Sequence, residues 1–187
     1  MRLFFRAGLA GLLITSFLVG CAYVPPDMMP APTQGSAPLA ASPFAHAGVV
    51  IAPTTGVHTS FWHMVNGDVM VQIPTFQEAL IRSMRQSALF ASVSDDGVSQ
   101  YQLHAEILTQ DRTTDRAVLV IRYVLRDSDT RRDVLVQEIE TSSSSTEDST
   151  PGAASIGGEA ALSRAAFRAA GKNIGLLLAK LRTIQTP

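Results

Sequence analysis

The sequence QYQLHAEILT at residues 100–109 alternates between apolar and polar side chains. Alternation of this kind is typical of a strand that has one face on a core and the other in water. The apolar set is Tyr101, Leu103, Ala105 and Ile107, and the polar set is Gln102, His104 and Glu106. The stretch therefore predicts a half-buried β-strand with His104 on its exposed face.

Residues 116–126 and 133–141 predict two further strands beside it. The sequence RAVLVIRYVLR at 116–126 is apolar on both faces, which is typical of a strand in the centre of a sheet. Residues 127–130 are short and polar, so the link between these two strands has hairpin length. The three stretches predict an antiparallel meander. Two earlier pieces at 49–53 and 69–73 also favour extended structure.

Residues 75–90 and 159–181 predict two helices. In the first, apolar residues recur at helical spacing, and Thr75 with Glu78 three residues later has the pattern of a capping box. The second carries a stripe of alanines and leucines, while the serine-rich residues 142–158 before it predict a loop. Helices on one face of a mainly antiparallel sheet form a two-layer α+β sandwich, which is the predicted fold class.

The N-terminus predicts an export signal. Arg2 and Arg6 precede a mainly apolar run at residues 7–19. As a helix this run would span roughly 20 Å, whereas the hydrocarbon core of a bilayer is roughly 30 Å thick. The run is therefore interpreted as the core of a signal peptide rather than as a transmembrane helix.

The apolar run ends in Leu18-Val19-Gly20-Cys21, which resembles the lipobox of bacterial lipoproteins. Cys21 is the only cysteine in the chain, so its thiol is the predicted site of lipidation. The resemblance implies a signal peptide at 1–20 and acyl chains that anchor the protein in a membrane. In that class an Asp after the cysteine commonly signals inner-membrane retention, so Ala22 implies the periplasmic leaflet of the outer membrane. An ordinary signal peptide and an uncut anchor are the alternatives.

Residues 21–47 predict a flexible tether rich in proline and alanine, and residues 48–187 predict one periplasmic α+β domain. The tether holds six prolines, which disfavour helix, and it shows little apolar periodicity. Met28, Met29 and Phe44 leave open the alternative that this arm packs on the domain. A length of 187 residues fits one domain with tails.

Composition excludes several classes of function. Lys and Arg number 15 against 16 Asp and Glu, and this balance excludes a strongly basic nucleic-acid binder. One cysteine excludes a disulfide framework and a multi-Cys zinc site. Ser155 lacks the first glycine of a nucleophile elbow, and His58 and His63 have the spacing of neither a strand face nor a helical metal pair. We expect no catalytic residue, no metal site and no cofactor, so the protein is not expected to be an enzyme.

The segment Phe61-Trp62-His63-Met64 is the candidate for partner binding. Exposed aromatic side chains commonly anchor a protein partner, because they bury a large area at a low entropic cost. The alternative is that Trp62 fills one end of the core. Phe61, Trp62 and Met64 are accordingly the candidate partner-binding residues.

A second resemblance spans residues 48–181. It rests on the order of the predicted elements and on a helix-to-strand pattern formed by Phe76, Ala79, Leu80, Ser83, Met84, Ser87, Leu89, Phe90, Tyr101 and Leu103. This pattern is similar to that of ABC-type transport auxiliary lipoproteins and of lipoprotein activators of penicillin-binding proteins. The resemblance implies an accessory or binding module that acts through envelope protein partners. The alternatives are an enzyme acting on cell-wall or lipid substrates and a self-associating structural lipoprotein.

Overall fold

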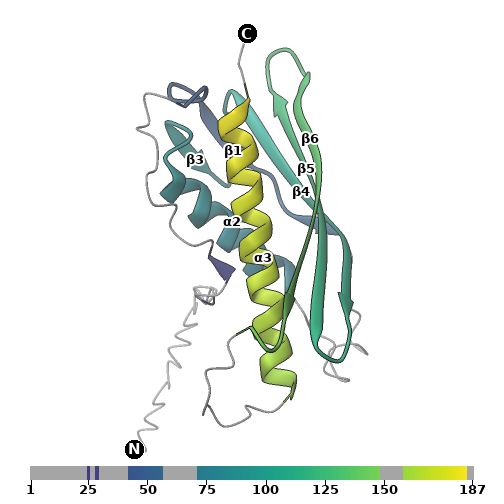
Figure 1. Ribbon diagram of the computed structural model, residues 1–187. Coiled ribbons are helices and arrows are strands. Elements are labelled where there is room, and N and C mark those ends of the chain that lie inside the picture. Colours follow the sequence, from purple (N-terminus) through teal and green to yellow (C-terminus); the bar gives the residue numbers. More distant parts are fainter. Residues whose placement is uncertain (1–24, 26–27, 30–41, 57–70, 148–157, 185–187) are drawn as a thin grey trace, which may run out of the picture.

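The computed structural model describes residues 25, 28–29, 42–56, 71–147 and 158–184 (Figure 1). These residues form a six-stranded sheet and two α-helices. In chain order the elements are β1 (Gly48–Ile51), β2 (Thr55–Gly56), α2 (Ile73–Ser87), β3 (Ser92–Ser94), β4 (Tyr101–Arg112), β5 (Arg116–Asp127), β6 (Asp133–Ser144) and α3 (Gly158–Thr183).

The sheet is open and mixed. Its strand order is β3-β1-β4-β5-β6, with β2 pairing farther along β4. The short strands pair in parallel, β1 with β3 and β4, and β2 with β4, whereas β4, β5 and β6 are antiparallel. Both helices lie on one face of this sheet (Figure 1). The predicted two-layer α+β sandwich is thus confirmed, and the short parallel strands make the sheet mixed. The strand predicted to be central, β5, is an interior strand that lies next to the edge strand β6.

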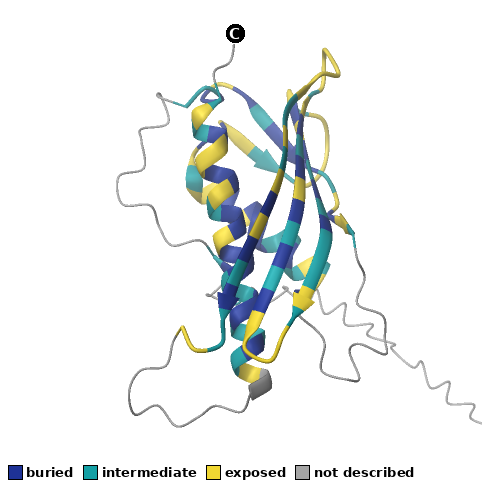
Figure 2. Cartoon of the chain, turned by 45° about the vertical axis from the view of Figure 1, so that its right-hand side comes forward, coloured by how far each residue is buried: buried dark blue, intermediate teal, exposed yellow. Residues whose placement is uncertain are grey.

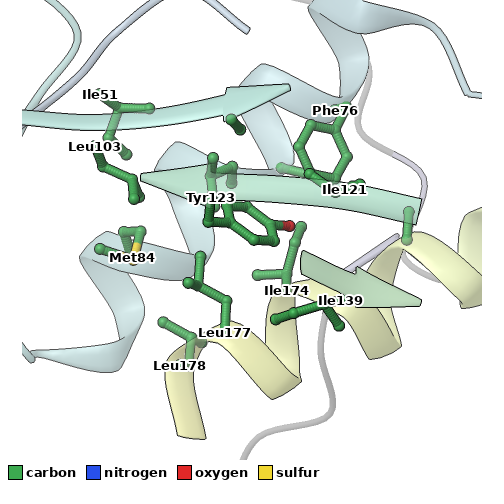
Figure 3. Close-up of a cluster of buried hydrophobic side chains, with 14 of the residues drawn as sticks. Ile51, Phe76, Met84, Leu103, Ile121, Tyr123, Ile139, Ile174, Leu177 and Leu178 are labelled. Atoms are coloured by element: carbon green, nitrogen blue, oxygen red, sulfur yellow. The ribbon is translucent and has the colours of Figure 1, made fainter. Parts of the chain in front are cut away.

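The core lies between the sheet and the two helices. The predicted apolar face of β4 is the buried one, and β5 contributes Leu119, Ile121, Tyr123 and Leu125. Figure 3 shows Tyr123 between the strands and Ile174 and Leu177 of α3. Among the described helices, none is long and apolar enough to cross a membrane.

A buried polar network ties α3 to the sheet. The Tyr123 hydroxyl donates to Asn173 Oδ1 at 2.8 Å, and Asn173 Nδ2 donates to the Ile139 carbonyl at 2.8 Å and to Thr141 Oγ1 at 3.2 Å. Thr141 Oγ1 in turn donates to the Ala169 carbonyl at 2.8 Å. Asn173 and Tyr123 are fully buried, so each polar group needs its partner, and the network fixes the register of α3 on β5 and β6.

Part of the segment assigned to the tether packs in the core. Met28 and Phe44 are fully buried, and the Phe44 ring stacks on Phe90 with centroids 4.6 Å apart. The Ala91 N–H donates to the Ala47 carbonyl at 2.9 Å, which joins this segment to the residues after α2. The packed structure therefore begins before the predicted boundary at residue 48, because the apolar side chains of the arm find a place against the domain.

The first helix begins earlier than the capping pattern predicts. It starts at Ile73, with Pro74 in its first turn, and Gln72 at the N-cap makes no side-chain capping bond. Proline suits this position because its missing N–H would have no helical partner there. Thr75 is therefore inside the helix and does not cap it. Of the predicted strand at 69–73, residues 69–70 lie outside the described residues, and Val71 and Gln72 are in neither a helix nor a strand.

The backbone of Val71 is hydrogen-bonded to a side chain, whereas the backbone of a strand residue would bond to a neighbouring strand. Its N–H donates to Gln110 Oε1 at 2.9 Å, and Gln110 Nε2 donates to its carbonyl at 3.2 Å. The amide of Gln110 thus satisfies both backbone groups of a buried apolar residue. Val71 thus has both of its backbone groups paired without being part of a strand.

Strand β2 depends on Gly56. The backbone of Gly56 has φ near +131°, and a Cβ at this position would lie 2.2 Å from the Ile107 carbonyl oxygen. Only glycine permits that conformation and so close an approach of two backbones. The chain therefore lies directly against β4 at this point, and the polar sequence around it gave no sign of a strand.

Candidate functional site

The face of the sheet opposite the helices is the candidate functional surface, and we call it the outer face. In Figure 2, no helix lies in front of the three long strands, and buried and exposed positions alternate along them. The cross-strand registers place residues in rows across this face: His104, Val124 and Val136 in one row, and Glu106, Arg122 and Glu138 in the next. The outer face therefore combines apolar and charged side chains of both signs.

The charged row has a balanced arrangement. Arg122 is exposed on the central strand and is directly opposite Glu106 on β4 and Glu138 on β6. Directly opposite side chains on antiparallel strands have Cβ atoms about 4.5–5.5 Å apart, where opposite charges attract. This row can offer both a cation and two carboxylates to a partner that lies across the strands.

A depression lies next to the valine row. It has a volume of about 250 Å³ and is lined by Ala52, Gln102, His104, Val124 and Arg126. Pockets for drug-sized ligands usually have volumes of roughly 300–1,000 Å³, so this one is of a size to receive a side chain or a small group. The valine and alanine give it an apolar part, and the guanidinium gives it a positive charge.

The cation at this depression is held in place by an ion pair. Arg126 Nε donates to Asp133 Oδ1 at 2.7 Å. This hydrogen bond raises the pKa of Arg126 and lowers the pKa of Asp133, and the attraction between the charges adds to both effects. The pair is solvent-exposed, so it orients the guanidinium more than it stabilises the fold.

His104 and Thr55 form a polar contact beside the same depression. His104 Nε2 and Thr55 Oγ1 are 3.0 Å apart. A hydroxyl next to an imidazole is a familiar start for nucleophilic catalysis, which also needs a third group to orient the base. Among the described residues no carboxylate is hydrogen-bonded to His104, and no group of three or more metal-ligating side chains is present there. The contact fixes the orientation of the imidazole on the outer face.

Known proteins share this fold. No family model matches the chain, and no curated protein matches it. The chain is similar in structure to protein XCC0632 from Xanthomonas campestris, of family DUF330, with a TM-score of 0.57 and 13% sequence identity over 82% of this chain and 90% of that one. It is also similar to protein CT253 from Chlamydia trachomatis, with a TM-score of 0.55 and 12% identity over 74% of this chain and 97% of that one.

A weaker similarity is to lipoprotein GNA1162 from Neisseria meningitidis. Its TM-score is 0.31 and its identity 11%, over 57% of this chain and 88% of that one, and at this level it carries no argument. Identities this low in the other two proteins show a shared fold alone. The comparisons therefore support the α+β architecture, and they give this chain no activity.

Only some of the residues singled out in the sequence are found at this site. Cys21, Phe61, Trp62 and Met64 lie outside the described residues, so lipidation and partner binding through them stay predictions. His104 was expected to be exposed; it lies on the predicted outer face, but it is half-buried and bonded to Thr55. Arg126 was missed as a site residue, although its place at the end of an alternating strand could have indicated it.

A separate cluster joins the end of β6 to α3. Glu147 accepts hydrogen bonds from Ser143 Oγ at 2.6 Å and from Lys172 Nζ at 3.0 and 3.1 Å, and Arg168 Nε lies 3.8 Å away. The hydrogen bond from Ser143, followed by that from Lys172, lowers the pKa of Glu147 from 4.5 to about 2. The same region corrects a sequence prediction. Residues 142–158 were predicted to form a loop, but Ser142–Ser144 belong to β6, because they pair with β5 as far as Arg116.

Glu147 should make the stability of the fold sensitive to acid. A carboxylate whose pKa is lower in the folded state contributes stability that is present above pH 4.5 and is lost as the pH falls toward 2. Glu147→Gln should therefore flatten the acid dependence of the unfolding free energy between those values, measured by urea unfolding at several pH values. Ser143→Ala should flatten it in part. An unchanged slope in Glu147→Gln would contradict this account.

Proposed function

We propose that the protein is a lipid-anchored accessory module of the bacterial envelope. In this proposal Cys21 carries the lipid, the anchor lies in the outer membrane, and the domain faces the periplasm. The domain acts by binding a protein partner in transport or cell-wall machinery, without catalysis, without a cofactor and without nucleic acid. The lipobox resemblance at Leu18-Val19-Gly20-Cys21 supports the anchor.

The observation that carries the partner-binding role is the outer face, which neither of the two described helices covers. A sheet face that carries valines among charges of both signs is suited to contact another protein, because interfaces combine an apolar centre with a polar rim. Val136 is 51% exposed, although it lies in a row with the half-buried Val124 and His104. The small depression next to Arg126 fits a single side chain of such a partner.

The anchor is tested by Cys21→Ser. This variant should receive no acyl chain and should no longer sediment with membranes, because the thiol that carries the lipid is absent. Labelling with a radioactive or clickable palmitate analogue measures the first effect, and fractionation of cells measures the second. Ala22→Asp is the matched control. It retains the thiol, so it should still receive the acyl chain, and it changes only the residue linked to the choice of membrane. Palmitate labelling of Cys21→Ser at the level of the natural chain would refute the assignment.

The binding surface is tested by crosslinking in intact cells. A photoreactive amino acid at Arg122, which is exposed in the middle of the outer face, should give a reproducible crosslink to one envelope protein. The matched control is the same amino acid at Lys180, which is exposed on α3 in the helix layer. Crosslinks at Lys180 and none at Arg122 would count against the outer face as the partner-binding surface.

A further inference from the structure

Strand β6 forms one edge of the sheet and is long for an edge strand. It spans 12 residues and pairs only with β5 in the described sheet. The opposite edge, β3, has 3 residues. A long edge presents unpaired backbone groups, and proteins usually shorten or cover such edges unless another chain pairs with them. The free side of β6 therefore needs an explanation.

The hydrogen bonds identify which residues of β6 point to this free side. The Ser145 N–H donates to the Asp115 carbonyl at 2.7 Å, so residue 145 faces β5. Backbone groups alternate between the two sides of a strand, and the register is unbroken between Leu135 and Ser144. The backbone groups of Val136, Glu138, Glu140, Ser142 and Ser144 consequently point away from β5.

Helix α3 covers one half of this edge. The Ser142 carbonyl accepts a hydrogen bond from Lys172 Nζ at 3.3 Å, and the Ser144 carbonyl accepts one from Arg168 at 2.8 Å. These bonds reach the edge from outside the sheet, which agrees with the alternation. Toward the other end, the Glu138 carbonyl accepts a bond from the side chain of Gln137 in the same strand, at 2.9 Å, which an added strand would share or replace. The open half thus centres on Val136, Glu138 and Glu140.

The side chains on the open half have a definite chemistry. Val136, Glu138 and Glu140 are all exposed, and all three stand on the outer face. A strand added here would place its own alternate residues next to two carboxylates and one valine. Lysine or arginine at those positions would be attracted, and acidic residues would be repelled.

We propose that the open half of β6 binds an extended, basic segment of the partner by adding a strand to the sheet. This inference rests on the proposed function and specifies the chemistry of the partner. Main-chain hydrogen bonds to Val136, Glu138 and Glu140 give the affinity, and the two carboxylates select lysine or arginine. A second copy of this chain fits less well, because β6 contains acidic residues and no lysine or arginine to face them.

The test uses the full chain in detergent and two synthetic peptides of equal charge. The first, acetyl-KVKVKVK-amide, can form a strand, whereas the second, the same sequence N-methylated at every residue's backbone nitrogen, carries equal charge and lacks the N–H donors that a strand would offer to β6. Amide hydrogen exchange measured by NMR should slow at least about tenfold at Val136, Glu138 and Glu140 with the first peptide only. Exchange at Leu135 and Gln137, which face β5, should change little.

Two variants separate the backbone from the charges. Val136→Pro removes an N–H that points to the free edge and leaves the bonds to β5 intact, so it should bind the first peptide at least about tenfold more weakly. Val136→Thr retains the N–H and is its control. Glu138→Lys combined with Glu140→Lys should also weaken binding, and its backbone is unaltered. Thermal unfolding of each variant confirms that the fold is retained.

Three results would overturn the inference. Equal slowing by both peptides would indicate general charge attraction, and an unaffected Val136→Pro would place the peptide elsewhere. A dimer of the chain that dissociates on Val136→Pro would show that a second copy occupies the edge. If the peptide test fails while the crosslink at Arg122 persists, the edge inference falls and the proposed function stands.

Discussion

Phe44→Ala should destabilise the protein by about 3–5 kcal/mol, as expected for truncation of a fully buried aromatic residue. The Phe44 ring stacks on Phe90 and meets Tyr101 edge-on, with centroids 5.2 Å apart. Its loss leaves a cavity between the residues after α2 and the start of β4. Urea unfolding followed by circular dichroism measures the change.

The control for this variant is Val98→Ala. Val98 is 95% exposed, so its truncation should change stability by no more than about 0.5 kcal/mol. If Phe44→Ala unfolds at the same urea concentration as Val98→Ala, residues 42–47 are not part of the core. In that case the domain boundary returns to residue 48.

Asn173→Ala should destabilise the protein by about 3 kcal/mol, because it removes the centre of the buried polar network. Tyr123 Oη loses its acceptor, and the Ile139 carbonyl and Thr141 Oγ1 lose a donor. Tyr123 is fully buried, and this burial raises the pKa of its hydroxyl well above the ordinary value. A buried polar group that loses its partner costs about 1–3 kcal/mol, and the Tyr123 hydroxyl contributes most, because Thr141 keeps its bond to the Ala169 carbonyl and Ile139 stays paired with β5.

A double-mutant cycle isolates the bond between these two side chains. Tyr123→Phe retains the ring and removes the hydroxyl, and the double variant should lose about 0.5–3 kcal/mol less than the sum of the two single variants. Tyr101→Phe is the matched control, since the Tyr101 hydroxyl takes no part in this network. Strict additivity would mean that the network does not act as a unit.

The regular alternation of the long strands made most of the fold predictable. Leu103 and Ile107 are buried and Glu106 faces outward, as the sequence of β4 predicts, because a period of two places alternate residues on one face. The valines at 118, 120 and 124 predicted a central strand, and β5 does lie between β4 and β6. This alternation is a local property of each strand, so it can be recognised in a single sequence.

The features that depend on distant contacts could not be predicted. Phe44 stands among prolines and small residues, and only the presence of Phe90 and Tyr101 makes it a core residue. Strand β2 has two residues and depends on one glycine against Ile107. The serines of β6 have low strand propensity, yet β5 and the bond from Ser143 to Glu147 hold them in the sheet.

The candidate site shows the same division. Alternation placed His104 on the outer face, but the sequence does not show that Thr55 meets it or that Arg126 and Ala52 complete a depression. These residues come from separate parts of the chain and converge only after the sheet has formed. Cys21, in contrast, is marked by its local sequence, and its lipidation was proposed without reference to the fold.

The place of α3 after the long strands in the sequence has a consequence for biosynthesis. Its residues Leu177 and Leu181 are fully buried, and Asn173 supplies the centre of the polar network. During synthesis the ribosome releases this helix after the three long strands, so the sheet lacks this part of its core until α3 has been made. During that interval the apolar inner face of the sheet has no helix α3 to cover it, so the domain can complete its fold only after α3 has been released.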